Sequence, residues 1–355
     1  MNSSGIAQRL PRLWFRRRLA PQLYPLLPLA VLFGALASLR RKLYQAGLLR
    51  AVRLSVPVIV VGNLTVGGSG KTPLVLWVVA QLRAAGRRPG IISRGYARDG
   101  KAVLAVDSGA SATEVGDEPL LLARRSGVPV FVGRNRALAG QALLDAYPDC
   151  DVLVSDDGMQ HYRLARDAEI AVFDGRGAGN GCWLPAGPLR ESLSRLQAVD
   201  AVVWNNTPAG AVAREAVVGC GRFAIPPVFD MVLHGRCFVH LHAPERTCTA
   251  QDLRGKRLCA IAGIGDPQRF FDQLSGLGLS FEARPFPDHH TYIASDLSCE
   301  SGTILLMTEK DAVKCAPFPI AEAWVLPVEA TVLHSANGCS LLVTLMEKID
   351  GCTSA

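Results

Sequence analysis

Residues 56–73 constrain the fold of this chain more than any other stretch of its sequence. Residues 56–61 form a short apolar run rich in valine and isoleucine, which is typical of a strand buried in a parallel sheet. A glycine-rich turn follows, and the apolar residues 74–83 then predict a helix that ends near Gly86. A buried strand, a tight turn and a helix in this order indicate an α/β fold.

The turn carries the residue types that bind phosphate. Gly67, Gly68 and Gly70 allow the backbone to turn its N–H groups inward, and such a nest at a helix N-terminus binds anions. Lys71 can reach the β- and γ-phosphates of a nucleotide, and the hydroxyl of Thr72 can ligate Mg²⁺. The stretch follows the P-loop pattern except at its first position, where a threonine replaces glycine. The predicted nucleotide-binding residues are Thr65, Val66, Gly67, Gly68, Ser69, Gly70, Lys71 and Thr72.

Charge is distributed unevenly along the chain. Residues 1–98 contain 16 Lys and Arg and no Asp or Glu, whereas the whole sequence carries 38 basic and 31 acidic residues. A basic front part favours an anionic surface as partner. No nucleic-acid motif accompanies it, so we expect anionic lipid and no nucleic acid. Ten cysteines without a Cys-x-x-Cys pair indicate reduced thiols in a cytosolic compartment.

Residues 1–50 have the pattern of a membrane-associated helical segment. Basic clusters at residues 16–18 and 40–42 bracket the apolar residues 19–39. Three prolines and Gly34 interrupt this apolar stretch and disfavour one straight spanning helix. We expect a helix or hairpin that lies in the membrane interface with its basic residues on anionic headgroups. The alternative is a helix packed on the body of the protein itself.

Candidate polar residues follow the next predicted elements. Arg94 comes after a predicted strand at residues 88–93, and ligands of α/β proteins gather at this end of strands. It is a candidate for holding an anionic substrate group, unless it is a surface arginine in a turn. Asp117 and Glu118 precede a predicted helix at residues 120–125. They either complement the helix dipole or divide work on a proton and on Mg²⁺.

A second acidic pair ends another predicted strand. Residues 151–155 are mostly apolar and lead into Asp156 and Asp157, as in a Walker B segment that places acid beside the Mg²⁺ of a P-loop. The polar residues Gln160 and His161 follow directly. A loop at residues 183–191 is rich in Pro and Gly, carries Arg190 and is apolar enough to contact a lipidic ligand.

A proline pair at residues 226–227 marks the predicted domain boundary, and a second α/β unit follows a ribbon-like stretch. We expect three parts: a membrane-associated segment (1–50), a P-loop domain (51–226) and a smaller α/β domain with the linking ribbon (227–355). The fold class is thus a P-loop NTPase-type, mostly parallel sheet with helices on both faces, plus the smaller domain. In that domain Asp288, His289 and His290 favour acid–base work over a metal site, because no third ligand motif is evident.

Several motifs in this order resemble the tetraacyldisaccharide 4′-kinase family, the lipid A 4′-kinases of Gram-negative bacteria, over nearly the whole chain. The motifs that carry the resemblance are Gly62 to Pro73, Ser93-Arg94-Gly95-Tyr96, Gly116-Asp117-Glu118-Pro119, Asp156-Asp157-Gly158-Met159-Gln160-His161, Leu184 to Glu191, Phe286 to His290 and Thr308-Glu309-Lys310-Asp311. The resemblance implies ATP-dependent phosphorylation of the 4′-hydroxyl of tetraacyldisaccharide 1-phosphate, giving lipid IVA. It also implies an enzyme at the cytoplasmic face of the inner membrane, with ATP and Mg²⁺ as cofactors and no obligate protein partner.

The resemblance also implies roles for individual residues. Asp117 corresponds to the general base, and His289 to the histidine that supports it. Lys71 corresponds to a catalytic phosphate contact. The implied Mg²⁺ contacts are Thr72, Glu118, Asp156 and Asp157, and the substrate-binding candidates are Arg94, Gln160, His161 and Arg190.

Two other classes of protein compete with a kinase. A P-loop GTPase or metallochaperone requires an Asn-Lys-x-Asp motif, and residues 308–311 approach it but place Lys and Asp side by side. A membrane-recruited ATP switch fits the basic front part but leaves Asp117 and the Asp-His-His stretch without a role. A comparison of GTP with ATP binding, and a search for phosphorylated lipid, discriminate these classes.

Overall fold

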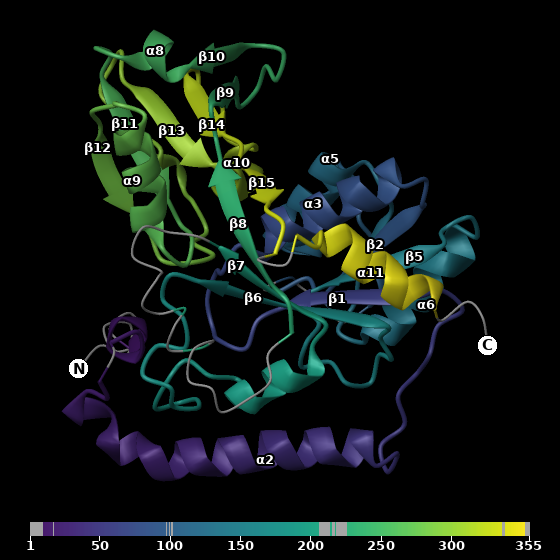
Figure 1. Ribbon diagram of the computed structural model, residues 1–355. Helices are drawn as coiled ribbons and strands as arrows, with labels where there is room; N and C mark the ends of the chain where they lie inside the picture. Colours follow the sequence, from purple (N-terminus) through teal and green to yellow (C-terminus); the bar gives the residue numbers. More distant parts are fainter. Residues whose placement is uncertain are drawn as a thin grey trace.

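Two β-sheets dominate the molecule (Figure 1). The computed structural model describes residues 10–16, 18–96, 98, 100, 102–205, 214, 217, 226–335 and 338–351. The larger sheet has nine strands in the order β15-β8-β7-β6-β1-β5-β2-β4-β3, and the smaller has six in the order β10-β9-β14-β13-β11-β12. The expected α/β class with P-loop topology is confirmed.

The larger sheet is parallel except at its two edges. Its parallel strands are β1 (Val58–Gly62), β2 (Pro89–Ser93), β4 (Val130–Val132), β5 (Val152–Asp156), β6 (Ala168–Asp174), β7 (Ala201–Asn205) and β8 (Val228–His234). The short β3 (Leu104–Ala105) and β15 (Glu329–Val332) pair antiparallel at the edges. Every residue of β1, β2, β5, β6 and β7 is buried, which explains why apolar residues predominate in these strands.

Helices cover both faces of the larger sheet. Apolar side chains of α3 (Lys71–Ala84), α5 (Asp117–Ser126) and α11 (Leu341–Asp350) form one core with the strands. On the other face, α6 (Arg136–Ala146) and the 3-10 helix η2 (Leu193–Ala198) form a second core. The short α4 (Ala112–Val115) precedes α5. Because the central strands are buried on both faces, helices must cover both sides of this sheet.

The smaller sheet has its own two cores. Its strands are β9 (Cys237–His240), β10 (Thr247–Thr249), β11 (Leu258–Ala262), β12 (Glu282–Pro285), β13 (Ile304–Thr308) and β14 (Ala323–Leu326). Residues of α8 (Ala250–Leu253) and α9 (Pro267–Gly276) pack on one face. On the other, α10 (Glu309–Cys315) packs with the segment that holds the 3-10 helix η3 (Ala294–Asp296).

The path of the chain between the sheets differs from the expected division at residue 227. The long strand β8 belongs to the larger sheet, and the C-terminal part of the chain returns to it as β15 and α11. Leu341, Leu345 and Ile349 of α11 bury their side chains against that sheet, so burial of an apolar helix face brings the chain back. We therefore propose a small domain limited to about residues 237–326, inserted between β8 and β15.

The N-terminal segment forms a 3-10 turn, η1 (Pro21–Leu26), that continues into the long helix α2 (Leu27–Gln45). The three prolines lie in η1 and the first turn of α2, where proline is tolerated, so the expectation that they interrupt the helix is wrong. An 18-residue window within residues 21–45 has a mean hydropathy of 1.7, and 17% of that window is buried, so by length and composition this helix could cross a membrane. In Figure 1, α2 extends along one side of the body, and Arg40 of this helix donates to the Gln160 carbonyl at 3.1 Å.

Candidate active site

The carboxyl ends of the parallel strands meet at the edge of the larger sheet that faces the smaller one. The glycine-rich turn follows β1, Arg94 follows β2, Asp156 ends β5, Asp174 ends β6 and Asn205 ends β7. A cavity of about 990 Å³ opens at this edge and is lined by residues of both sheets and of α2. Its position is the one that strand topology assigns to ligands of α/β proteins.

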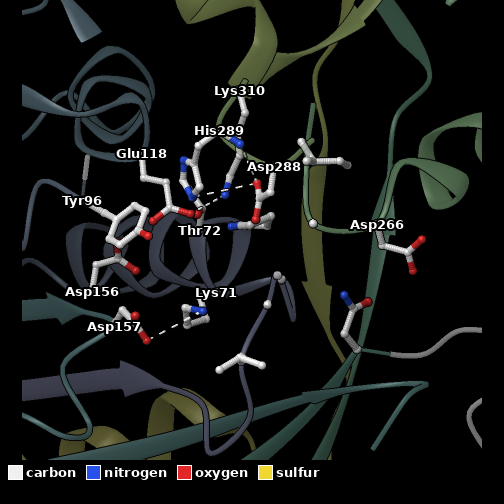
Figure 2. A pocket seen from close by; sticks show the side chains of 18 of the residues that line it. Lys71, Thr72, Tyr96, Glu118, Asp156, Asp157, Asp266, Asp288, His289 and Lys310 are labelled. Carbon is white, nitrogen blue, oxygen red and sulfur yellow. Dashed lines mark hydrogen bonds and ion pairs between the residues drawn. The ribbon is translucent and has the colours of Figure 1, made fainter. Parts of the chain in front are cut away.

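The glycine-rich turn forms the floor of the cavity at the start of α3. Gly67 and Gly70 have φ angles of 97° and 94°, a backbone conformation that favours glycine. Thr72 is buried, whereas the amine of Lys71 lies 3.7 Å from Asp157 Oδ1 (Figure 2). Thr65 and Ser69 are buried and do not reach the cavity wall. The turn therefore has the form of a phosphate cradle in which the last glycine opens a helix N-terminus.

Asp117 and His289 meet across the gap between the sheets. The Nδ1 atom of His289 lies 2.9 Å from Asp117 Oδ2, and the other carboxylate oxygen accepts the backbone N–H of Glu118 at 2.9 Å. Asp117 is the first residue of α5, where it follows Gly116 with a φ angle of 95°. His289 itself has a φ angle of 57°, which aims its ring from the loop after β12. The pair therefore joins α5 of the larger sheet to a loop of the smaller one.

The two partners shift each other's pKa. Burial raises the pKa of Asp117, but the hydrogen bond and charge of His289, with the charges of Lys310 and Lys314, more than offset this, so the net shift is downward. The hydrogen bond to Asp117 raises the pKa of His289 above its ordinary value. A carboxylate with a lowered pKa beside a histidine with a raised pKa favours the ion pair at neutral pH.

Two more ion pairs connect α5 to α10, which follows a strand of the smaller sheet. Lys310, the second residue of α10, pairs with Glu118 of α5. Arg125 near the end of α5 pairs with Glu309. The charge of Lys310 lowers the pKa of Glu118 despite its burial. These contacts hold α5 and α10 side by side and so fix the acids at the start of α5 relative to the smaller sheet.

Asp156 and Asp157 have different environments although they are neighbours. Burial, together with the charges of Glu118 and Asp157, raises the pKa of Asp156 to about 7. One of its oxygens accepts from the Ser93 hydroxyl at 3.3 Å, and the other is buried without a partner. Asp157 instead pairs with Arg190 at 3.0 Å and with Lys71, and these cations lower its pKa.

This donor set fits Mg²⁺. A buried carboxylate oxygen without a partner, on a side chain near two further carboxylates, Glu118 and Asp157, is a position that a cation would stabilise. Within the described residues, no three His, Cys, Asp or Glu side chains form a group that could hold a metal alone. Mg²⁺ in phosphoryl-transfer sites is usually held by one or two carboxylates plus phosphate oxygens and water, so a complete protein cage is not required.

The substrate-binding candidates separate into two groups. Arg94, Gln160 and Arg190 line the cavity, and Arg94 is exposed there. His161 does not line it, because its Nε2 atom accepts the backbone N–H of Arg136 at 3.3 Å. Burial, and then the charge of Arg136, lowers the pKa of His161 to about 4. The structure thus brings three of the four candidates to the cavity, whereas the fourth, His161, is half-buried and accepts a backbone hydrogen bond.

Sequence reasoning missed several polar residues around the cradle. Asn63, Arg136, Arg176 and Asn205 were given no role, and Lys310 was considered only as part of the motif at residues 308–311, without a role of its own. Arg136 is 3% exposed and donates to the backbone carbonyls of Asp156 and Asp157. A usable signal existed for the two asparagines, because each is a polar residue at the carboxyl end of a buried parallel strand.

This combination of fold and site defines a P-loop phosphotransferase. A family model described as tetraacyldisaccharide-1-P 4′-kinase matches residues 23–347 of the chain. The chain therefore belongs to the tetraacyldisaccharide-1-P 4′-kinase family, and it is an ATP-dependent kinase of lipid A biosynthesis.

Individual relatives agree with the family model over nearly the full length. The chain is 52% identical to a tetraacyldisaccharide 4′-kinase of Dechloromonas aromatica (strain RCB) over 348 residues, which cover 98% of each protein. It is 54% identical to the protein of that name from Azoarcus sp. (strain BH72) over 328 residues, 92% of this chain and 93% of that one. Among solved structures, LpxK from Aquifex aeolicus in complex with ATP shares 31% identity with a TM-score of 0.77 and covers 92% of this chain and 99% of that one.

Proposed function

We propose that this kinase transfers the γ-phosphoryl group of ATP to the 4′-hydroxyl of tetraacyldisaccharide 1-phosphate, with Asp117 as the general base. The observation that supports this role most is the 2.9 Å contact between Asp117 and His289, because His289 lines the cavity that also holds the phosphate cradle. Asp117 itself is buried directly behind His289 and is not among the lining residues, so the proposal requires the sugar hydroxyl to reach its carboxylate beside His289.

The lowered pKa of Asp117 suits a late proton transfer. The sugar O–H bond breaks as the new O–P bond forms, and the proton moves to the Asp117 carboxylate while ADP leaves. Phosphoryl transfer passes through a loose transition state, so the hydroxyl needs orientation first and deprotonation late. His289 donates a hydrogen bond to Oδ2 of Asp117, which keeps the carboxylate ionised and fixes its orientation. Proton transfer by a placed group contributes about 10²–10⁴-fold to the rate.

The cradle would bind the phosphates of ATP, and the acidic side chains would hold Mg²⁺ or position the nearby cations. Lys71 would contact the β- and γ-phosphates, and Thr72 with Asp156 would hold Mg²⁺, which neutralises charge on the phosphates when bound. Glu118 and Asp157 are each paired with a cation, Lys310 and the Arg190–Lys71 group respectively. We assign these two acids to positioning of the cations.

The lipid substrate would approach along α2. Phe33, Leu36 and Arg40 of that helix line the same cavity as the P-loop, together with Leu184 of the loop after β6. Leu29, Val31 and Leu32 are more than half exposed on α2, as expected of a surface that meets acyl chains. We propose that the enzyme works at the cytoplasmic face of the inner membrane with its basic front part on anionic headgroups.

A direct assay tests the proposal. Purified protein is incubated with γ-labelled ATP, Mg²⁺ and tetraacyldisaccharide 1-phosphate in mixed micelles, and labelled lipid is separated from ATP. We expect label on the lipid with wild type and a loss of about 10²–10⁴-fold with Asp117→Asn. Slow ATP hydrolysis without labelled lipid would favour the ATP switch and overturn the proposal.

A further inference from the structure

Three consecutive carbonyl oxygens of the glycine-rich turn each accept a hydrogen bond from a side chain. Asn63 Nδ2 donates to the Gly67 carbonyl at 3.2 Å. Arg176 Nη2 donates to the Gly68 carbonyl at 2.9 Å, and Asn205 Nδ2 donates to the Ser69 carbonyl at 3.2 Å. The donors come from the carboxyl ends of three different strands, β1, β6 and β7. Together, these three side chains fix the positions of the three carbonyl groups.

A trans peptide points its carbonyl and the following N–H in opposite directions. Holding these three carbonyls therefore turns the N–H groups of Gly68, Ser69 and Gly70 to the opposite side, as a phosphate nest requires. We propose that Asn63, Arg176 and Asn205 are positioning residues that hold the cradle in its phosphate-binding form before the nucleotide arrives. This inference rests on the proposed function only in assuming that the cradle binds the phosphates of ATP.

The composition of the turn explains why such support is needed. Three of its residues are glycine, which loses more conformational freedom on ordering than any other residue. A flexible turn would lose this freedom when ATP binds, so a turn held in advance binds ATP more tightly. The side chain of Asn205 also packs closely against the turn, because a methyl group added at Gly70 would lie 2.6 Å from Asn205 Nδ2.

The three donors are themselves held in place. Asn63 is fully buried and Asn205 is 3% exposed. The guanidinium of Arg176 binds the Asp174 carboxylate, with its Nη2 atom at 2.7 Å from Oδ2 and its Nε atom at 3.1 Å. These contacts leave each donor little freedom to turn away from its carbonyl.

Arg176 also connects the cradle to the smaller sheet. Asp174 binds a second arginine, Arg269 of α9, at 3.0 Å, and Arg269 in turn contacts Asp266 at 3.4 Å. The backbone of Gly265 lies beside Gly68, because a methyl group added at Gly265 would be 3.2 Å from the Gly68 nitrogen. Of the three donors, Arg176 is the one whose position depends on both sheets, so its loss should disturb the cradle most.

Nucleotide binding to single variants tests the inference. Arg176→Met removes the donor but keeps the length of the side chain, and Asn205→Leu removes the donor in a side chain of similar size. Calorimetric titration would give dissociation constants for ATP, ADP and AMP. We expect ATP and ADP to bind about fivefold more weakly to each variant, since the loss of about 1 kcal/mol of hydrogen-bond energy corresponds to about fivefold in affinity. AMP, which lacks the phosphates held by the cradle, should change less than about twofold, and Arg176→Lys should recover part of the affinity.

The control is Arg83→Met, which removes an arginine bond to the Ser126 carbonyl at the far end of α3 and should leave all three affinities unchanged. A rise in the KM for ATP without a matching rise in the KM for lipid separates positioning from general loss of structure. Should Arg176→Met fail to fold, Asn205→Leu carries the test. Unchanged ATP affinity in Asn205→Leu and in any folded Arg176 variant, or equal losses for AMP and ATP, would overturn the inference. Failure of the wild type to bind ATP would instead refute the cradle as a nucleotide site.

Discussion

The Nδ1 atom of His289 lies 2.9 Å from Oδ2 of Asp117, although 172 positions separate the two residues along the chain. Asp117 begins a helix that packs on the larger sheet, and His289 lies in a loop of the smaller one. The pair exists only when the two sheets adopt this mutual arrangement. Any separation of the two sheets would therefore break this contact, and a variant that removes the contact should loosen the packing between the sheets.

Replacement of Asp117 by asparagine should remove the base and keep the shape of the side chain. We expect kcat to fall by about 10²–10⁴-fold, while the dissociation constant of ATP stays within about twofold. Steady-state kinetics with the labelled-lipid assay, together with calorimetry, measures both quantities. Asp107→Asn, at an exposed turn, is the matched control and should keep full activity. Near-normal turnover of Asp117→Asn would refute the assignment of the base.

The contact between Asp117 and His289 predicts a pH-dependent stability. Because the pKa of His289 is raised, its contribution to the free energy of unfolding is complete below its unfolded-state pKa of 6.5 and is lost as pH rises through its folded-state pKa. Because the pKa of Asp117 is lowered, its contribution to the free energy of unfolding is complete above its unfolded-state pKa of 3.8 and is lost as pH falls through its folded-state pKa. The difference in Tm between wild type and His289→Gln should therefore be larger at about pH 6 than at about pH 9.

Differential scanning fluorimetry across this pH range measures the difference in Tm. His242→Gln, on the smaller sheet outside the cavity, is the matched control for loss of an imidazole. A difference in Tm that stays constant from pH 6 to pH 9 would show that the His289 proton does not contribute to the contact.

Asp156 should make the requirement for Mg²⁺ depend on pH. Burial and neighbouring acids raise its pKa to about 7, and a carboxyl group must lose its proton to bind a metal. We expect the Mg²⁺ concentration for half-maximal activity to rise by up to about tenfold for each pH unit below 7 in the wild type. Asp156→Asn should need more Mg²⁺ at every pH and show a weaker dependence, which also corrects for protonation of ATP itself. Identical pH dependence in both proteins would exclude Asp156 as the titrating ligand.

Lys71→Met should be more damaging than Asp117→Asn. The ammonium group would hold the β- and γ-phosphates and also lies 3.7 Å from Asp157, so its loss removes a phosphate contact and unbalances the acids. We expect kcat/KM for ATP to fall by more than about 10³-fold, with weaker ATP binding as well. Lys256→Met, at an exposed position, is the matched control. Unchanged kinetics in Lys71→Met would remove the phosphate cradle from the mechanism.

The exposed apolar face of α2 should bind membranes. Leu29 and Leu32 are each 56% exposed, and burial of one leucine side chain in an apolar phase contributes about 1.5–3 kcal/mol. Leu29→Glu with Leu32→Glu should weaken binding to vesicles that contain anionic phospholipid by at least about tenfold and leave ATP affinity unchanged. Leu138→Glu is the control, because that leucine is 59% exposed on α6. An equal loss with Leu138→Glu would show that α2 has no special role in membrane binding.

Much of the larger sheet could be predicted because its strands are mostly apolar. Strands β1, β2 and β5 were predicted within about two residues of their bounds. The return of the chain to the larger sheet could not be predicted in this way. Strand β15 alternates in burial and is only four residues long, so it carries no signal of the sheet it joins.

The site shows the same division between local and distant information. Cradle, acidic pairs and the Asp-His-His loop are contiguous residues whose chemistry depends on side-chain type and on the strand or helix they follow. Those could be identified from the sequence. The partners of Glu118 and Asp157, and two of the three donors to the cradle carbonyls, Arg176 and Asn205, are more than 30 residues away in the chain. Hydrogen bonds between distant segments leave no periodic pattern, so sequence reasoning had no means of pairing them.

The sequence by itself determined that this chain is an α/β protein with a phosphate-binding turn, because apolar periodicity and glycine spacing act over a few residues. Only the tertiary structure decided that His161 accepts a backbone hydrogen bond outside the cavity, that one oxygen of Asp156 has no partner, and that Arg176 donates to the Gly68 carbonyl. Each of these depends on which groups exclude water from a side chain and which compete for its hydrogen bonds. Those neighbours are set by the packing of two sheets against each other, which no local stretch of sequence records.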